Sequence, residues 1–283
     1  MQNFEKINLE QDNIEKIFLH SLFDIETVNL LYNHPKLLEK SYWIIWGGDL
    51  YSAPNDEKNN FIRNNMKAYI ACVKGDEKIA ADKYSSKALL FSARYAGPID
   101  LKELDEVKQI KKDYIQIQIN NSCDETTLEM LDILSKFKNE KIKIITILSY
   151  GQTQFKQEII NKGCRIFKEK FGWIENSLKP EDFVQHLSEN DILVLNQNRQ
   201  QGGGNIAASA YLGKKIFIKS EITSYKNMLQ KGVKIFDTNS IKNLSFDEFI
   251  DLDNETKRKN IAAAKLIYDS QSRIKSWQDI FAR

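Results

Sequence analysis

The sequence predicts an α/β protein with two Rossmann-like, parallel-sheet domains that face a cleft. Short apolar runs alternate with longer amphipathic stretches along the chain, a pattern typical of βαβ units whose parallel sheets are buried on both faces. The length of 283 residues suits two domains of ordinary size. A turn signal at Ala96-Gly97-Pro98 and a charge-rich segment at 100–112 divide the runs into two series.

The first series predicts four strands with helices between them. Asp24 suits the N-cap of the first helix, because its carboxylate can accept hydrogen bonds from amides of the first turn. We expect strands at Lys16–Leu19, Tyr42–Trp46, Ala68–Cys72 and Ala88–Phe91, and helices at Ile25–Asn33, Glu57–Asn65 and Asp76–Lys83.

The second series predicts a larger sheet and a long closing helical segment. We expect strands at Tyr114–Ile119, Ile142–Leu148, Gly163–Phe167, Asp191–Leu195 and Lys215–Ile218, with Val233–Phe236 at the edge. The expected helices are Thr126–Lys138, Gln154–Asn161, Glu181–Ser188, Asn205–Leu212, Ile222–Gln230 and Glu255–Phe281, the last broken near Ser270. Domain boundaries are therefore expected at 1–105 and 106–254, with 255–283 crossing back to the first domain.

Composition excludes several classes of protein. The formal net charge of +2 provides no strong field for nucleic acid, so no nucleic-acid partner is expected. The three cysteines contain no Cys-x-x-Cys pair, which favours isolated thiols in a reducing cytoplasm. No apolar run approaches the ~20 residues needed to span a bilayer, and the polar segment 1–11 is no signal peptide. We expect a cytoplasmic protein that meets membranes only peripherally.

The segment from Asn198 to Asn205 is the most informative loop. It follows an apolar strand, and ligands of open parallel sheets bind beyond the carboxyl ends of strands. The glycines at 202, 203 and 204 can bring backbone amides to a diphosphate, and a helix N-terminus would add its dipole. The residues expected to bind a nucleotide sugar here are Arg199, Gln200, Gln201, Gly202, Gly203, Gly204 and Asn205. A flexible loop without a ligand is the alternative.

Two further loops of the second domain are candidate donor contacts. Asn121, Ser122 and Asp124 follow the first strand and precede a helix, so they suit either phosphate binding or simple helix capping. Gly151 follows the second strand. The aromatic run at 171–174, expected in a loop, suits a nucleobase or the core equally. No metal-ligand cluster appears and no Asp-x-Asp lies near an expected strand end, so we expect no metal and no other cofactor, with the leaving group neutralised by Arg199, amides and helix dipoles.

The first domain provides the candidate acceptor-side residues. Gly47, Gly48 and Tyr51 flank Asp49 after a strongly apolar strand, where the Asp49 carboxylate could accept a proton from an attacking hydroxyl. A tight turn capped by Asp49 is the alternative. His20 ends the first strand and is the second candidate base. His34 and His186 lie in or beside helices and are expected to be structural.

Lipid contact has one candidate patch. Basic residues of the first domain lie beside apolar ones, a combination that suits an anionic lipid surface or an ordinary solvated helix face. The basic residues are Lys36, Lys40, Arg63 and Lys67, and the apolar ones are Leu37, Leu38, Phe61 and Met66.

Several of these segments together resemble one family. The segments are Phe18–Phe23, Trp46-Gly47-Gly48-Asp49-Leu50-Tyr51, Asn121-Ser122-Cys123-Asp124, Tyr150-Gly151 and Arg199-Gln200-Gln201-Gly202. In order and spacing they resemble the bacterial TDP-N-acetylfucosamine:lipid II N-acetylfucosaminyltransferases, the 4-alpha-L-fucosyltransferase family of enterobacterial common antigen synthesis. Compared with the family, we expect the first strands and helix to be absent and the N-terminal domain to be shortened, and the family's Gly-Asn-Ser-Gly-Asp loop reads Asn120-Asn121-Ser122-Cys123-Asp124 here.

The resemblance implies a GT-B fold and a metal-independent hexosyltransferase. It implies a TDP-sugar or related donor in the C-terminal domain and a polyprenyl-diphosphate-linked glycan acceptor near the N-terminal domain. Such an acceptor implies work at the inner-membrane surface. Two alternatives stay open: a nucleotide-sugar epimerase of the same fold, which would need no acceptor, and a non-catalytic subunit that binds a glycan or serves as a scaffold.

Overall fold

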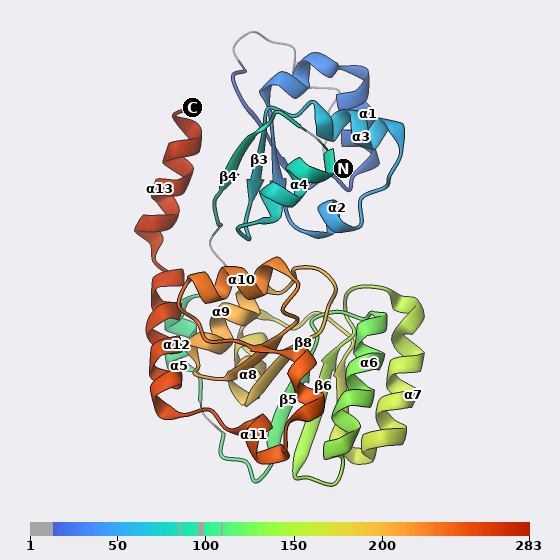
Figure 1. The fold of residues 1–283 in the computed structure, drawn as a ribbon, viewed down its shortest axis with the longest axis vertical. Helices are drawn as coiled ribbons and strands as arrows, with labels where there is room; N and C mark the ends of the chain where they lie inside the picture. Colours follow the sequence, from blue (N-terminus) through green and yellow to red (C-terminus); the bar gives the residue numbers. More distant parts are fainter. Residues whose placement is uncertain (1–13, 85, 96–98, 109) are drawn as a thin grey trace. The chain divides into compact units, whose positions relative to one another are not determined.

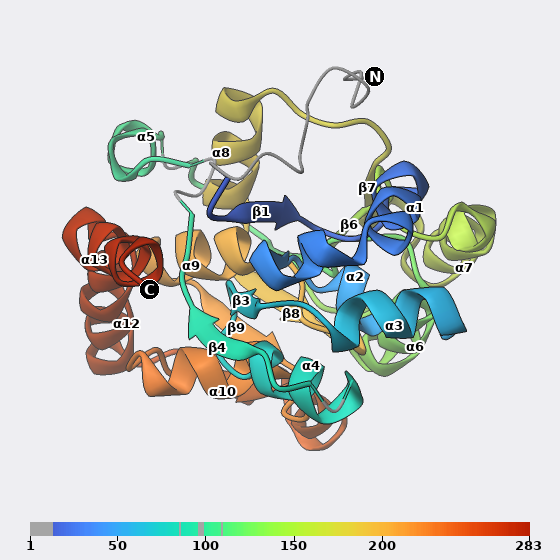
Figure 2. The same cartoon turned by 90° about the horizontal axis from the view of Figure 1, so that it is seen from above.

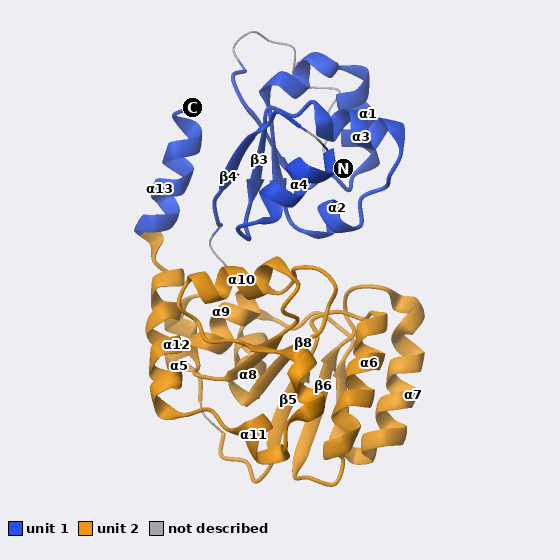
Figure 3. Cartoon of the chain, viewed as in Figure 1, with its two compact units in different colours: residues 1–95, 271–283 blue, residues 96–270 orange. Residues whose placement is uncertain are grey.

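The chain divides into two compact units. The computed structural model describes residues 14–84, 86–95, 99–108 and 110–283 (Figure 1). Unit 1 comprises residues 1–95 and 271–283, and unit 2 comprises residues 96–270 (Figure 3). The expected turn at 96–98 and the polar segment 1–11 lie outside the described residues.

The division falls between residues 95 and 96, earlier in the chain than the boundary after residue 105 that the sequence predicted. The reason is the packing of α5 (Leu101–Glu106), whose Leu104 is buried with Val184 and Leu187 of unit 2. The expected closing helix is two helices, α12 (Asn254–Ile267) in unit 2 and α13 (Ser270–Phe281), most of which belongs to unit 1.

Unit 1 is a four-stranded parallel sheet with buried residues on both faces. The strands β1 (Ile17–His20), β2 (Ser41–Ile45), β3 (Ala68–Ala71) and β4 (Leu89–Ser92) pair in that order. Successive residues of a strand point to opposite faces. Trp43 therefore packs in the cluster that contains residues of α1 (Ile25–Asn33) and α3 (Glu57–Asn64), and Ile44 packs in the cluster that contains Ile280 of α13.

Three helices and α13 cover this sheet. α1 and α3 lie side by side, and α4 (Asp76–Tyr84) contacts β3 and β4 (Figure 2). Asp24 caps α1 as expected, accepting a hydrogen bond from the Thr27 amide at 2.8 Å. The sequence therefore predicted these four strands and α1, α3 and α4 to within a few residues.

The expected lipid patch in unit 1 is wrong in its composition. Arg63 is 0% exposed, and Leu37, Leu38 and Met66 are buried as well. The guanidinium group of Arg63 donates to the carbonyls of Leu22 and Asp49 at 3.2 and 3.3 Å. Burial of an arginine requires such partners, and here they lie inside the unit. Arg63 therefore braces the core of unit 1 instead of facing a membrane.

Unit 2 is a six-stranded parallel sheet in the order β10-β9-β8-β5-β6-β7. The strands are β5 (Ile115–Ile119), β6 (Ile142–Ile147), β7 (Phe171–Ile174), β8 (Ile192–Leu195), β9 (Lys215–Ile218) and β10 (Phe236–Asp237). Chain order reverses between β5 and β8, which pair directly. Such a reversal sends the loops of two adjacent strands to opposite faces and makes the place between them the usual ligand site of this fold.

Helices cover both faces of the larger sheet. One hydrophobic cluster joins the sheet to α6 (Glu125–Leu134), α7 (Lys156–Phe167) and α11 (Phe246–Ile250). A second joins it to α9 (Gly203–Tyr211), α10 (Thr223–Gln230) and α12. α8 (Pro180–Glu189) packs beside α9, which in turn lies against α12. The α/β class with two parallel sheets is therefore confirmed.

One expected strand of unit 2 is wrong. Gly163–Phe167 is the end of helix α7, because Ile159, Gly163 and Phe167 form its buried stripe at helical spacing. The strand is instead β7, at the run expected in a loop. A β-carbon at Gly163 would lie 2.4 Å from the Phe171 ring, so this glycine lets α7 lie close to β7.

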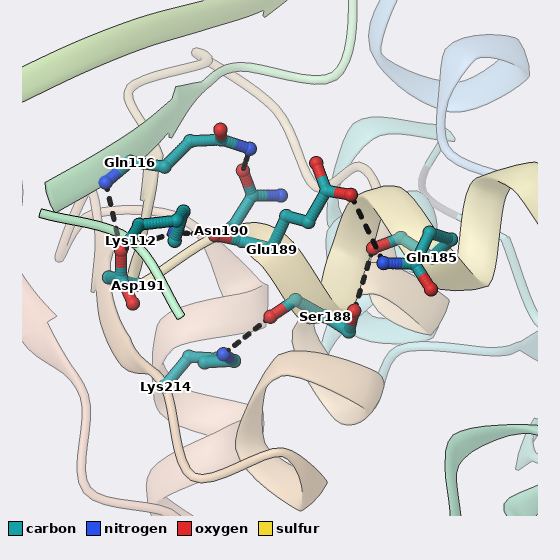
Figure 4. A network of polar contacts seen from close by, with 8 residues as sticks. All are labelled: Lys112, Gln116, Gln185, Ser188, Glu189, Asn190, Asp191 and Lys214. Carbon is teal, nitrogen blue, oxygen red and sulfur yellow. Dashed lines mark hydrogen bonds and ion pairs between the residues drawn. The ribbon is translucent and has the colours of Figure 1, made fainter. Parts of the chain in front are cut away.

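Buried polar side chains join β5 to the end of α8 (Figure 4). Gln116 donates from its backbone amide to Asp191 and from its side chain to Asn190, at 2.8 and 3.1 Å. Lys112 forms an ion pair with Asp191 at 2.7 Å and also donates to the carbonyl of Glu189. Lys214 donates to the carbonyl of Ser188 at 2.7 Å. Two lysines therefore satisfy carbonyls at the carboxyl end of α8, where positive charge is favoured.

His186 of α8 joins the same network. Its Nε2 lies 2.9 Å from Oε1 of Gln118 on β5. Burial lowers the pKa of His186 to about 4 from its ordinary value of 6.5. The ring is therefore neutral at pH 7, as expected for a structural histidine.

We expect the folded state to lose stability as the pH falls from about 6.5 towards 4. The unfolded chain binds a proton on His186 in this window and the folded chain does not, so the loss reaches roughly 3 kcal/mol. Urea unfolding of the wild type and His186→Gln at several pH values would measure it, since glutamine keeps a donor for Gln118. Identical pH profiles for the two proteins would contradict the assignment.

Candidate functional site

Three loops of unit 2 meet at the carboxyl edge of its sheet. The loops after β5 and β6 are joined by an isolated parallel bridge between Cys123 and Gly151. Cys123 donates from its amide to the carbonyl of Tyr150, and Gln152 donates to the carbonyl of Cys123, both at 2.7 Å. Gly151 has a φ of +107°, and a β-carbon there would lie 2.4 Å from the carbonyl oxygen of Cys123. Only glycine fits this junction.

The loop after β8 is tied to the loop after β5 through Ser122. The side-chain amide of Gln197 donates to the Ser122 hydroxyl at 2.8 Å. That hydroxyl lies 2.9 Å from a carboxylate oxygen of Asp124 and 3.4 Å from Oε1 of Gln201. The residues of the two loops that were expected to bind a nucleotide sugar therefore lie together where the strand order of the sheet reverses.

The turn at Gly202 begins helix α9. Gly202 is the N-cap residue, with φ 69° and ψ 31° in the left-handed region. A β-carbon at this position would lie 1.9 Å from Nδ2 of Asn121, so a side chain is excluded by both conformation and space. Asn205, one turn into the helix, donates to Oδ1 of Asn121 at 2.7 Å. The start of α9 is thus packed directly on the loop after β5.

The first turn of α9 is open. Among the described residues, no side chain caps it. A β-carbon at Gly203 would meet nothing within 4 Å. Helix amides without partners and the positive end of the helix dipole favour an anion at such a place.

Two buried polar atoms in the loops after β5 and β8 have no partner. Within the described part of the chain, Nδ2 of Asn121 and Oε1 of Gln197 are buried without a hydrogen bond. Leaving such an atom unpaired costs about 1–3 kcal/mol. Unpaired polar groups therefore accumulate where the sequence predicted a ligand.

The remaining expected donor residues differ in exposure. Arg199 is half-buried and makes a long contact of 3.5 Å to the carbonyl of Gln200. Gln200 itself is 6% exposed, so its side chain belongs to the interior. Asp124 caps α6, accepting from the Thr126 amide at 3.0 Å, and this matches the capping alternative.

Asp49 of unit 1 is an internal residue of its loop. It is 0% exposed, and it accepts hydrogen bonds from the Trp43 indole at 2.6 Å and from the Trp46 amide at 3.0 Å. Burial raises the pKa of its carboxyl above the ordinary value, and these two hydrogen bonds and the nearby Arg63 offset only part of that rise. This geometry does not support the expected role as a base, because Asp49 is fully buried and both of its carboxylate oxygens accept hydrogen bonds from within unit 1.

The neighbours of Asp49 form a turn and a short helix instead of an irregular loop. Gly47 has a φ of +97°, and Gly48–Tyr51 forms the short helix α2. The Phe23 ring covers Gly48, where a β-carbon would lie 2.7 Å from its Cζ atom. The Tyr51 hydroxyl donates to Asp76 at 2.7 Å.

His20 is the exposed candidate of unit 1. It ends β1, and its Nε2 lies 3.2 Å from the Tyr95 hydroxyl. The Trp46 and Tyr95 rings are stacked, with centroids 5.9 Å apart, and Trp46 is 46% exposed. Tyr95 is a site residue that the sequence did not predict. It follows β4 as a single aromatic residue, and no motif marks it.

The described residues hold neither a metal-ligand cluster nor a spanning helix. No group of three or more His, Cys, Asp or Glu side chains among them is placed to hold a metal ion. None of their helices is long and apolar enough to cross a bilayer.

Solved structures share this fold at low sequence identity. A glycosyltransferase from Rickettsia africae matches with a TM-score of 0.71 and 11% identity, over 95% of this chain and 76% of its own. Anabaena HepE, solved with UDP and glucose, matches with a TM-score of 0.64 and 11% identity, over 91% of this chain and 76% of its own. A UDP-forming trehalose-phosphate synthase from Burkholderia xenovorans matches with a TM-score of 0.66 and 9% identity, over 94% and 72%.

The sequence itself matches a family model. No curated protein matches the chain. The model of the 4-alpha-L-fucosyltransferases, glycosyl transferase group 56, matches residues 6–283, which is nearly the whole chain. The fold of the solved neighbours is that of GT-B glycosyltransferases. This chain therefore belongs to the 4-alpha-L-fucosyltransferase family and is a hexosyltransferase of GT-B fold.

Proposed function

We propose that the chain transfers a deoxyamino sugar, N-acetylfucosamine or a close analogue, from a TDP- or UDP-sugar to a polyprenyl-diphosphate-linked glycan in bacterial surface polysaccharide synthesis. The observation that carries the donor half is the open first turn of α9, which starts at the left-handed Gly202 beside Arg199. The acceptor and the sugar follow from the resemblance of the loop motifs to the family.

The donor diphosphate binds at the start of α9. The amides at 203 and 204 donate to its oxygens, and the half-buried Arg199 adds a guanidinium group, which suits phosphate geometry. The structure of Anabaena HepE with UDP and glucose supports a nucleotide donor for this fold. In this mechanism the protein neutralises the leaving diphosphate with fixed dipoles and Arg199, and it uses no metal or other cofactor.

The acceptor side lies in unit 1, and His20 is its candidate base. The acceptor hydroxyl gives its proton to the imidazole as its oxygen bonds to the anomeric carbon of the donor sugar. The bond from that carbon to the diphosphate breaks, and the nucleoside diphosphate leaves with the electron pair. The Tyr95 hydroxyl orients His20, and the exposed Trp46 ring offers an apolar face to a sugar ring. Gly47, Gly48 and Tyr51 belong to the turn and short helix α2 that directly follow Trp46.

The same acceptor places the chain at a membrane surface. A polyprenyl diphosphate is anchored in the bilayer, so the enzyme works peripherally on the cytoplasmic face of the inner membrane. Ile25 and Phe23, which are 71% and 57% exposed in unit 1, are the apolar side chains offered for that contact.

Arg199→Ala weakens nucleotide binding roughly tenfold to a hundredfold, because a hydrogen bond to a charged group contributes about 1.5–3 kcal/mol. Titration calorimetry with UDP and TDP measures the loss. Arg165→Ala, an exposed arginine of α7 in the same unit, is the matched control and leaves affinity unchanged. Equal affinity of Arg199→Ala and the wild type would remove Arg199 from the donor site.

Gly203→Ala separates folding from binding. Its β-carbon meets no protein atom within 4 Å, so we expect the free energy of unfolding to stay the same or to rise by up to about 1 kcal/mol. The added methyl group occupies space proposed for the diphosphate, so UDP or TDP affinity falls. Gly202→Ala, in contrast, loses stability because of its left-handed φ and its contact with Asn121. Unchanged nucleotide affinity in Gly203→Ala would place the ligand elsewhere.

His20→Ala lowers turnover roughly a hundredfold or more while nucleotide affinity stays the same, since general base catalysis contributes at least that factor. Transfer to a lipid-diphosphate glycan measures turnover, and calorimetry measures affinity. His34→Ala, the other exposed histidine of unit 1, keeps full activity. Near-normal turnover of His20→Ala would exclude it as the base.

A further inference from the structure

Alternate residues of β5 carry amides on one face. Gln116 and Gln118 are 2% and 0% exposed, and they alternate with isoleucines that pack in the core on the opposite face. A buried amide needs hydrogen bonds, since burying it without them costs several kcal/mol. The two glutamines find their partners in residues of α8, the segment after it and the loop after β5.

These amides form a chain with a single direction. Nε2 of Gln116 donates to Oδ1 of Asn190 at 3.1 Å, and Nδ2 of Asn190 donates to Oε1 of Gln118 at 2.9 Å. Nε2 of Gln118 then donates to Oδ1 of Asn121 at 2.8 Å. Asn190 and Gln118 each accept at the side-chain oxygen and donate from the nitrogen, so the orientation of one of these amides determines that of the next.

His186 fixes the same direction. Its Nε2 lies 2.9 Å from Oε1 of Gln118, an oxygen that can only accept, so this nitrogen carries the proton. Burial keeps the ring neutral at pH 7 by lowering its pKa to about 4. Gln118 therefore has two donors on its oxygen and cannot turn its amide without losing both.

The row of hydrogen-bonded amides ends at Asn121, beside the start of α9. Oδ1 of Asn121 receives donors from both Gln118 and Asn205, so Nδ2 must point the other way. There it lies against Gly202, buried and without a partner. An unpaired donor destabilises the unliganded protein, but its positive end faces the turn proposed to bind the diphosphate.

We propose that Gln116, Asn190, Gln118 and His186 are positioning residues for the donor site, which hold the Asn121 amide with its N–H end towards the Gly202 turn. This inference rests on the proposed function, because it assigns the amide chain to the diphosphate. Gln118 is the critical link, since it joins Asn190 and His186 to Asn121. The Asn121 amide adds its dipole to the free amides of α9, and both favour a negative ligand.

Two substitutions of Gln118 test the chain. Gln118→Glu keeps the accepting end but turns the donating end into an acceptor, which favours the reversed Asn121 amide, with its oxygen towards the Gly202 turn. Gln118→Met removes the link without adding charge and leaves the Asn121 amide held by Asn205 alone. Asn260→Asp is the matched control: Asn260 is 1% exposed on α12 of the same unit, and it bonds only the backbone of Lys234 among the contacts described.

The readout is affinity for UDP and TDP relative to uridine and thymidine, measured by calorimetry together with thermal unfolding of each protein. We expect diphosphate affinity to fall roughly tenfold or more in Gln118→Glu and by a smaller factor in Gln118→Met, with nucleoside affinity unchanged. Asn260→Asp keeps the wild-type ratio whatever its stability.

The failures are distinguishable. A wild type that binds neither diphosphate overturns the proposed function. A wild type that binds them, with Gln118→Met at the same diphosphate-to-nucleoside ratio, overturns the amide chain alone. A loss that is equal for nucleosides and diphosphates also overturns it, because general damage to the fold does not select for phosphate.

Discussion

The close packing of Gly202 on Asn121 is the contact on which the proposed nucleotide-sugar site of unit 2 depends. It sets where α9 begins, and it requires both a glycine and a left-handed turn. Because β5 and β8 are direct neighbours, their loops reach this place from opposite faces of the sheet. A side chain at 202 would separate the two loops, and the open first turn of α9 would no longer lie beside the loop after β5.

Buried amides of β5 lead to this contact, because Gln118 donates to Asn121. One face of β5 packs isoleucines into the apolar core, and the opposite face carries glutamines. A buried polar network stabilises less than an apolar core, but it specifies a single arrangement. Unit 1 uses the same principle, with Arg63 and Asp49 inside its core holding the segment that carries Trp46.

The sequence predicted the architecture well, because strands buried on both faces appear as short apolar runs that helices separate. It failed at Gly163–Phe167, where the buried stripe of a helix has the composition of a strand, and at 171–174, where an interrupting glycine concealed β7. Arg199 and the glycines after it could be assigned to a loop at the sheet edge from local sequence alone. The burial of Asp49 could not, because its partners Trp43 and Arg63 become neighbours only in the folded unit. Tyr95 was unpredictable for the same reason, since it contacts His20, a residue 75 positions earlier in the sequence.

The assignment of α13 to unit 1 has a consequence for biosynthesis. The second apolar cluster of unit 1, around Tyr42, Ile44 and Ile70, is completed by Ile280 and Trp277. The ribosome makes these residues after all of unit 2, although the strands that need them emerge first. The nascent first unit must therefore wait with one sheet face uncovered, a state in which chains aggregate readily.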